Sequence, residues 1–164
     1  MNGFKIRSIE PSDELIVASL LEKHWGSRQV VSRGKVQDAA KLSGFVALDG
    51  DEIVGLVTLH PDPAGCEVVT LDAFVQGRGL GSALLSEAEK FARFRGCGRL
   101  WLITSNDNVG ALTFYQKLGF RMVAIHREAI TEARKLKPQI PLVGENGIPI
   151  KDEIELEKLL SDAE

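Results

Sequence analysis

The first third of the chain predicts a strand, a helix and a polar connection. Residues 4–9 alternate apolar and polar side chains, the period of a half-buried strand. Pro11 interrupts this alternation. Ser12 then offers a capping hydroxyl, and the acidic residues 13 and 14 follow where a helix dipole favours them, so we expect a helix that ends near His24. Residues 26–43 are polar and basic, and we expect a loop there with one short helix.

The middle of the chain predicts an antiparallel meander that changes into alternating helices and strands. Two apolar runs, 45–48 and 53–59, flank Asp49-Gly50, a strong hairpin signal, and the β-branched run 67–74 predicts a third strand. Beyond these strands, apolar side chains at helical spacing predict helices over about 80–95 and 109–118, with strands over 100–103 and 120–125. This order is typical of an α/β protein with a mixed central sheet of six to seven strands and flanking helices.

The last part of the chain, from Arg127 onward, has a weaker pattern. Residues 128–136 predict a short helix, and the prolines and glycines that follow predict an irregular loop. Residues 152–157 alternate, which favours a last strand. A helix is the alternative, because Leu156, Leu159 and Leu160 also fit a helical period.

Composition narrows the class of protein. A chain of 164 residues predicts one domain, and 20 basic against 23 acidic residues argue against nucleic acid as the main partner. We find no apolar run long enough for a membrane span, and the first residues lack the apolar stretch of a signal peptide. Cys66 and Cys97 form neither a disulfide framework nor a metal-binding pair. We therefore expect a cytoplasmic protein with no metal and no membrane partner.

The segment 76–82 is the main candidate for chemistry. Three glycines at alternate positions, between a predicted strand and a predicted helix, leave backbone N–H groups bare at a helix N-terminus, which favours phosphate or pyrophosphate. A tight turn that needs glycine for its dihedral angles is the alternative. A Walker loop is excluded because no Gly-Lys-Ser/Thr follows Gly77. A dinucleotide fingerprint fits except for Ser82, but it would lie after several strands rather than at the first.

Two motifs resemble the GNAT superfamily of acyl-CoA-dependent N-acyltransferases. Gln76-Gly77-Arg78-Gly79-Leu80-Gly81 is similar to the family's Gln/Arg-x-x-Gly-x-Gly/Ala loop. The run from Asn108 to Phe120 resembles its Asn-x-x-Ala-x-x-Phe-Tyr-x-x-x-Gly-Phe motif. One helix and one strand separate the two motifs, in the family's order. The resemblance extends from Phe4 to about Arg127 and implies the GNAT fold, with residues 1–164 as one N-acetyltransferase domain.

The resemblance implies roles for particular residues. The backbone amides of Gln76, Gly77, Arg78, Gly79, Leu80, Gly81 and Ser82 would hold the coenzyme A pyrophosphate. The strand backbone at Leu71 and Ala73 would pair with the pantetheine arm, and Asn108 would contact that arm. Tyr115 would act as the general acid for the departing thiolate. Its alternative role is that of a packed core aromatic.

The base that takes the proton of the acceptor amine is less clear. The family often uses a Glu on the strand before the loop, which favours Glu67. Asp72 competes with it, and strand alternation predicts that Asp72 lies on the opposite face. Only Phe74 and Val75 separate Ala73 from Gln76, where the family commonly has a longer segment, so the register of this strand is open. A water molecule is a further alternative.

The function implied by the resemblance is direct acetyl transfer from acetyl-CoA to a primary amine of a small molecule or peptide. Residues 127–164 are a candidate acceptor-site extension. Their acidic residues 152, 153 and 155 would suit a cationic acceptor, whereas Arg134, with Arg33 and Arg127, would suit an anionic one. The rivals are a non-catalytic acyl-CoA-binding module and a nucleotide-binding oxidoreductase. A homodimer is compatible with the sequence.

Overall fold

The computed structural model describes residues 3–160. Residues 1 and 2, the start of the segment in which we expected no signal peptide, lie outside the described residues, as do residues 161–164. The chain divides into two compact units. The first comprises the chain up to Gln29, Asp38–Leu100 and the chain from Leu159, and the second comprises Val30–Gln37 and Trp101–Lys158.

The first unit is built on four strands in the order β1-β4-β5-β6, and each neighbouring pair is antiparallel. They are β1 (Lys5–Ser8), β4 (Ser43–Asp49), β5 (Glu52–Asp62) and β6 (Gly65–Ala73). Gly50 has a φ of 60° in the turn between β4 and β5, so the predicted hairpin is confirmed. Its two turn residues are Gly50 and Asp51, one position later than predicted, because Asp49 pairs with Glu52.

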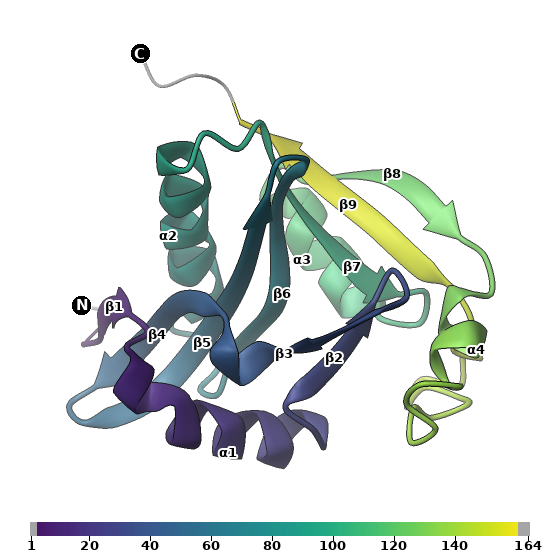
Figure 1. Cartoon of the computed structure of the whole chain (residues 1–164), viewed down its shortest axis with the longest axis horizontal. Helices are drawn as coiled ribbons and strands as arrows, with labels where there is room; N and C mark the ends of the chain where they lie inside the picture. Colours follow the sequence, from purple (N-terminus) through teal and green to yellow (C-terminus); the bar gives the residue numbers. More distant parts are fainter. Residues whose placement is uncertain (1–2, 161–164) are drawn as a thin grey trace. The chain divides into compact units, whose positions relative to one another are not determined.

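Two helices and two short 3-10 turns complete the first unit (Figure 1). They are η1 (Pro11–Asp13), α1 (Glu14–Trp25), η2 (Ala39–Lys41) and α2 (Leu80–Phe94). Helix α2 packs on β4, β5 and β6 through an apolar stripe that repeats every three to four residues, and α1 packs on η2. Burial of each large aliphatic side chain of the stripe contributes about 1.5–3 kcal/mol. The stripe begins at the buried Leu80, so it holds the first turn of α2, which overlaps the glycine-rich segment 76–82, against the sheet.

The start of α1 differs from the prediction. Ser12 is exposed and does not cap the helix; the carboxylate of Asp13 instead accepts a hydrogen bond from the Glu10 backbone N–H, 2.7 Å away. The Arg7 guanidinium donates to both Asp13 carboxylate oxygens, at 2.7 and 3.0 Å, and these bonds hold the pKa of Asp13 below its usual value. The capping prediction was wrong because Pro11 opens a 3-10 turn ahead of the helix and Arg7 lies within reach of the buried carboxylate.

The segment that we expected to be a loop with one short helix contains two strands. Strands β2 (Gln29–Ser32) and β3 (Lys35–Asp38) form a hairpin, and η2 is the expected short helix. Arg33 and Gly34 connect the strands with φ values of 50° and 75°, the two positive angles of a type I′ turn. The loop prediction was wrong because strands of four mostly polar residues carry almost no apolar alternation, and Arg is a rare residue at the first turn position.

The second unit contains the remaining strands and helices. They are β7 (Arg99–Ser105), which begins in the first unit, α3 (Val109–Lys117), β8 (Arg121–His126), α4 (Ala129–Ala133) and β9 (Glu153–Leu159). Strand β9 confirms the last strand and rules out the helical alternative, and α4 is shorter than predicted. The strand order is β7-β9-β8, with β9 antiparallel to β8. The α/β class with a mixed sheet, here of seven strands, is confirmed.

Candidate active site

The glycine-rich segment forms a loop with open space beside it. Gly77 has a φ of 79°, and Gly79, the N-cap of α2, has a φ of 71°. A Cβ atom added at either position would meet nothing within 4 Å. Glycine is therefore required at these positions by the backbone conformation, not by crowding, and the space that a ligand would need is open.

The first turn of α2 presents bare backbone donors. No side chain within the described residues caps this helix, and the first intrahelical bond is that from the Ala83 N–H to the Gly79 carbonyl, at 3.0 Å. The N–H groups of Leu80, Gly81 and Ser82 precede that bond, so they have no acceptor inside the helix. Together with the positive end of the helix dipole, they form a site that suits the oxygens of a phosphate.

Two side chains of the loop hold its backbone in place. The Arg78 guanidinium donates to Asp49 at 2.9 Å and lies over the Phe4 ring, 5.7 Å from the ring centroid. The Gln76 amide donates to the Ala73 carbonyl at 3.2 Å. Arg78 therefore ties the loop to the β4–β5 hairpin, and its contribution to anion binding would come from its backbone N–H.

A β-bulge in β6 changes which side chains share a face. Thr58 pairs with Thr70 and Leu59 with Val68, so Val69 has no opposite residue on β5. The extra residue reverses the alternation, and Glu67 and Asp72 therefore lie on the same face of β6. The prediction of opposite faces was wrong, because alternation holds only along an unbroken ladder.

Asp72 has an unusual environment on that face. One carboxylate oxygen accepts a hydrogen bond from the Trp25 indole N–H at 2.7 Å, whereas Oδ2 is buried and has no partner among residues 3–160. Burial raises the pKa of Asp72, and the Trp25 hydrogen bond and the charge of His24 oppose this rise. The His24 ring in turn stacks on Phe74, with centroids 4.3 Å apart.

Sequence reasoning missed His24 and Trp25 as neighbours of this site. Trp25 is 47 residues from Asp72 in the chain, so no local pattern could pair them. Glu67 is only 5% exposed and lies opposite His60. Leu71 and Ala73 lie on the other face of β6, opposite Val57 and Gly55, directly before the loop. The first unit thus brings together the predicted residues 67, 71, 73 and 76–82.

The second unit holds the two remaining predicted residues on one helix. The Asn108 side chain caps α3 by accepting the Ala111 N–H at 3.1 Å. Tyr115 is 9% exposed, and its ring makes edge contacts with Phe114 and Phe120, with centroids 5.2 and 5.4 Å apart. Burial and these ring contacts restrict the position of the Tyr115 ring. General acid catalysis requires a side chain that is positioned in this way.

The charged residues of the tail have structural partners. Asp152 accepts the Glu128 N–H at 2.8 Å, and Glu155 lies 2.8 Å from His126 Nε2. The Arg134 guanidinium donates to three backbone carbonyls, at 3.2, 2.6 and 2.6 Å, which fastens the loop after α4. Arg134 therefore has a structural role that uses its Nε and Nη2 donors.

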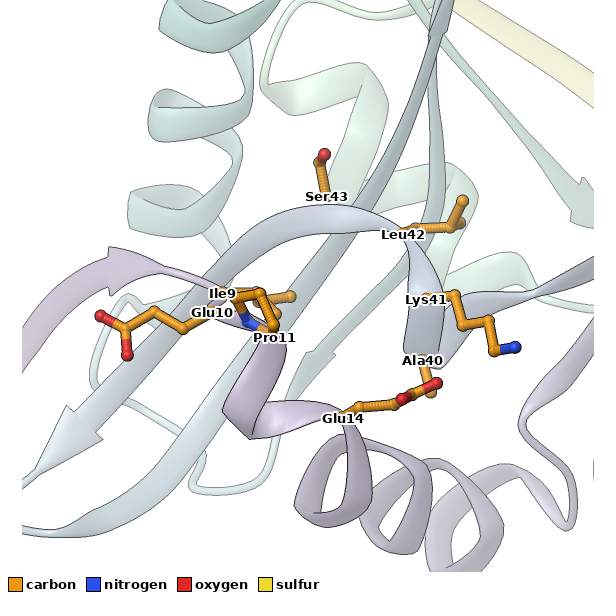
Figure 2. A pocket seen from close by; sticks show the side chains of 8 residues that line it. All are labelled: Ile9, Glu10, Pro11, Glu14, Ala40, Lys41, Leu42 and Ser43. Carbon is orange, nitrogen blue, oxygen red and sulfur yellow. The ribbon is translucent and has the colours of Figure 1, made fainter.

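A separate hollow of about 380 Å³ lies in the first unit, between the start of α1 and the segment from η2 to β4. In Figure 2 the Glu14 side chain extends toward Ala40, whereas that of Glu10 points away from the other side chains. Glu14 is paired with Arg28 at 3.0 Å. None of the predicted site residues lines this hollow.

Residues 3–160 contain neither a metal-binding cluster nor a helix that could span a membrane. No group of three or more His, Cys, Asp or Glu side chains in this range could hold a metal ion. None of the helices described there is long and apolar enough to cross a membrane.

An uncapped helix start directly after a bulged strand is the arrangement that the resemblance to the GNAT superfamily implies for its coenzyme A site. The model of the acetyltransferase (GNAT) family matches residues 13–120. The chain belongs to this family, and it is an acetyl-CoA-dependent acetyltransferase. The alternatives of a non-catalytic binding module and a nucleotide-binding oxidoreductase are thereby set aside.

The chain is also similar to individual proteins over most of its length. The uncharacterized protein YxbD of Bacillus subtilis is 42% identical over 88% of this chain and 92% of its own length. The streptothricin acetyltransferase of Streptomyces lavendulae is 28% identical over 73% of this chain and 64% of its own length. A GNAT family acetyltransferase from Elizabethkingia anophelis, solved with acetyl-CoA bound, superposes with a TM-score of 0.69 at 23% identity, over 98% of this chain and 100% of its own.

Proposed function

We propose that this enzyme transfers the acetyl group of acetyl-CoA directly to a primary amine of a small molecule or peptide. The observation that carries the proposal is the loop at Gly77 and Gly79, with open space beside it and the uncapped first turn of α2 behind it. We take residues 1–164 as one N-acetyltransferase domain in which residues 127–164 extend the acceptor site. We also propose a reducing, cytoplasmic location, since Cys66 and Cys97 are both free.

Each predicted residue has a distinct part in this proposal. The backbone amides of residues 76–82 bind the pyrophosphate, and the backbone at Leu71 and Ala73, with Asn108, orients the pantetheine arm. Glu67 takes the proton of the attacking amine, directly or through water. Tyr115 gives its hydroxyl proton to the sulfur as the thioester carbon–sulfur bond breaks and the carbon–nitrogen bond forms.

The proposed reaction is tested with an amine library and detection of the released coenzyme A thiol. We expect thiol release above the hydrolytic background with a subset of primary amines, and acetylated amine in equal amount by mass spectrometry. The library should include streptothricin, amino acids, peptides and polyamines. Thiol release that never exceeds hydrolysis, with acetyl-CoA still bound, would contradict transfer to an amine.

The identity of the base predicts a pH-dependent defect. Glu67→Gln keeps the size of the side chain but cannot accept a proton, so we expect a loss of rate of about 10²–10⁴-fold below the pKa of the amine. The loss should diminish as pH rises, because the free amine then needs no base. Rate against pH for the wild type and variant gives the measurement, and Glu52→Gln at the exposed start of β5 is the matched control.

Asp72→Asn tests the competing base on the same face. Burial raises the pKa of Asp72, so its carboxylate ionises at higher pH in the folded state than in the unfolded chain. A carboxyl group whose pKa is higher in the folded than in the unfolded state stabilises the fold at low pH. This contribution is lost as the pH rises through the pKa of the folded state. Asp72→Asn should therefore unfold at the same or higher temperature than the wild type at neutral pH. If it, and not Glu67→Gln, loses rate with rescue at high pH, Asp72 is the base.

A further inference from the structure

The second unit contains a hollow that is lined by none of the residues proposed to hold acetyl-CoA. Its volume is about 630 Å³, within the range of small-molecule sites. The tip of the β2–β3 hairpin, the end of β8, and α4 with the residues after it form its walls. The lining residues are Arg33, Gly34, His126, Arg127, Ala129, Glu132, Ala133, Lys135 and Leu136.

The lining carries an excess of positive charge. Lys135 is paired with Glu132 at 2.7 Å, and Arg33 lies 3.4 Å from the almost fully buried carboxylate of Glu153. Arg127 is exposed and has no partner among the described residues. The whole chain has a net charge of −3, so this excess is local and does not reflect a generally basic surface.

The backbone at Arg33 is strained. Arg33 adopts a φ of 50°, a left-handed conformation that costs an ordinary residue free energy and that Asn or Gly would adopt more readily. Strain of this kind is found where a side chain must be placed for a function. The guanidinium of Arg33 lies at the hollow, and the side chain is 41% exposed although it pairs with Glu153.

We propose that this hollow binds the carboxylate of a small molecule, with Arg127 as the main charged contact and Arg33 as the second. Arg donors match a carboxylate in geometry, and their charge-assisted hydrogen bonds are the strong ones. Ala129, Ala133 and Leu136 offer an apolar wall to the rest of the ligand. The carboxylate could belong to either of two ligands. One is an amino acid or peptide that serves as the acetyl acceptor, an assignment that rests on the proposed function. The other is a small acid that regulates the enzyme.

The experiment compares acids with their amides. The probes are matched pairs of amino acids and dipeptides with their C-terminal amides, such as glycyl-leucine and glycyl-leucinamide, titrated calorimetrically into the full chain. We expect at least one acid to bind tenfold or more tightly than its amide. Arg127→Gln should remove most of that preference without changing the affinity for the amide. Arg121→Gln, which removes the same charge from β8 outside the hollow, should retain the preference.

Turnover separates the two sources of the carboxylate. If the acid is acetylated and Arg127→Gln raises its KM while kcat for the amide stays unchanged, the hollow is part of the acceptor site. If the acid is not acetylated but changes the rate with another amine, the hollow is regulatory. The proposal is overturned if no acid of the panel is preferred over its amide, or if Arg127→Gln leaves the preference intact. Acetyl-CoA affinity, measured in each variant, reports on the loop independently of the hollow.

Discussion

Tyr115→Phe should lower the rate of acetyl transfer by about 10²–10⁴-fold while acetyl-CoA binds nearly as well as before. The ring keeps its edge contacts with Phe114 and Phe120, so the fold and the packing of α3 are retained. Only the hydroxyl is lost, and with it the proton for the departing thiolate. Single-turnover kinetics are the appropriate measurement, because they report the chemical step even where product release limits kcat.

Thr113→Val is the matched control for this variant. It also removes a hydroxyl from α3, where Thr113 donates to the Val109 carbonyl at 2.9 Å on the exposed side. We expect a near-normal rate for Thr113→Val. A Tyr115→Phe enzyme that loses less than about threefold in single turnovers would make Tyr115 a packing residue rather than a general acid. Tyr115 is the only tyrosine of the chain, so the ultraviolet absorbance of its phenol can be followed directly as a function of pH.

Gly79→Asp should abolish acetyl-CoA binding at ordinary assay concentrations. A carboxylate held about 6 Å from the pyrophosphate, at an effective dielectric of about 20, repels it by about 2.8 kcal/mol per unit of phosphate charge. That energy corresponds to a loss of affinity of about 100-fold. The added Cβ meets no protein atom within 4 Å, so overlap with the protein itself does not enter the effect. Calorimetric titration with acetyl-CoA gives the affinity, and the shift of melting temperature with acetyl-CoA checks it.

Two variants separate charge from backbone strain. Gly79→Ala has the same left-handed conformation to accommodate but adds no charge, so it should lose far less affinity than Gly79→Asp. Gly96→Asp lies beyond the other end of α2, with a φ of 76° and no atom within 4 Å of an added Cβ. It should destabilise the fold to a similar degree and leave acetyl-CoA affinity unchanged. Undiminished affinity in a folded Gly79→Asp protein would contradict the assignment of the loop.

The errors of sequence reasoning in this chain have definite physical causes. Ser12 looked like a helix cap, but no side chain among the described residues caps α1. Asp13 occupies the N-cap position, and its carboxylate accepts from the Glu10 backbone N–H ahead of the helix and from Arg7 on another element. The β2–β3 hairpin was not predicted because its strands are short and polar and its turn begins with Arg33. In the first case the deciding interaction joins residues from different elements, which a local pattern does not connect. In the second case the local pattern is too short to indicate a strand.

The sequence by itself determined the elements that carry strong local signals, and through its two motifs it determined the family. Glycine at 77 and 79 is required by positive φ angles, and Asn108 caps the helix that bears Tyr115; both are consequences of neighbouring residues alone. The tertiary structure decided what depends on pairing. The bulge at Val69, visible only in the register against β5, placed Glu67 and Asp72 on one face, and the contact between Trp25 and Asp72 joins residues 47 positions apart. Strand alternation is a local rule, but a bulge is a property of two strands, so only the folded sheet could correct it.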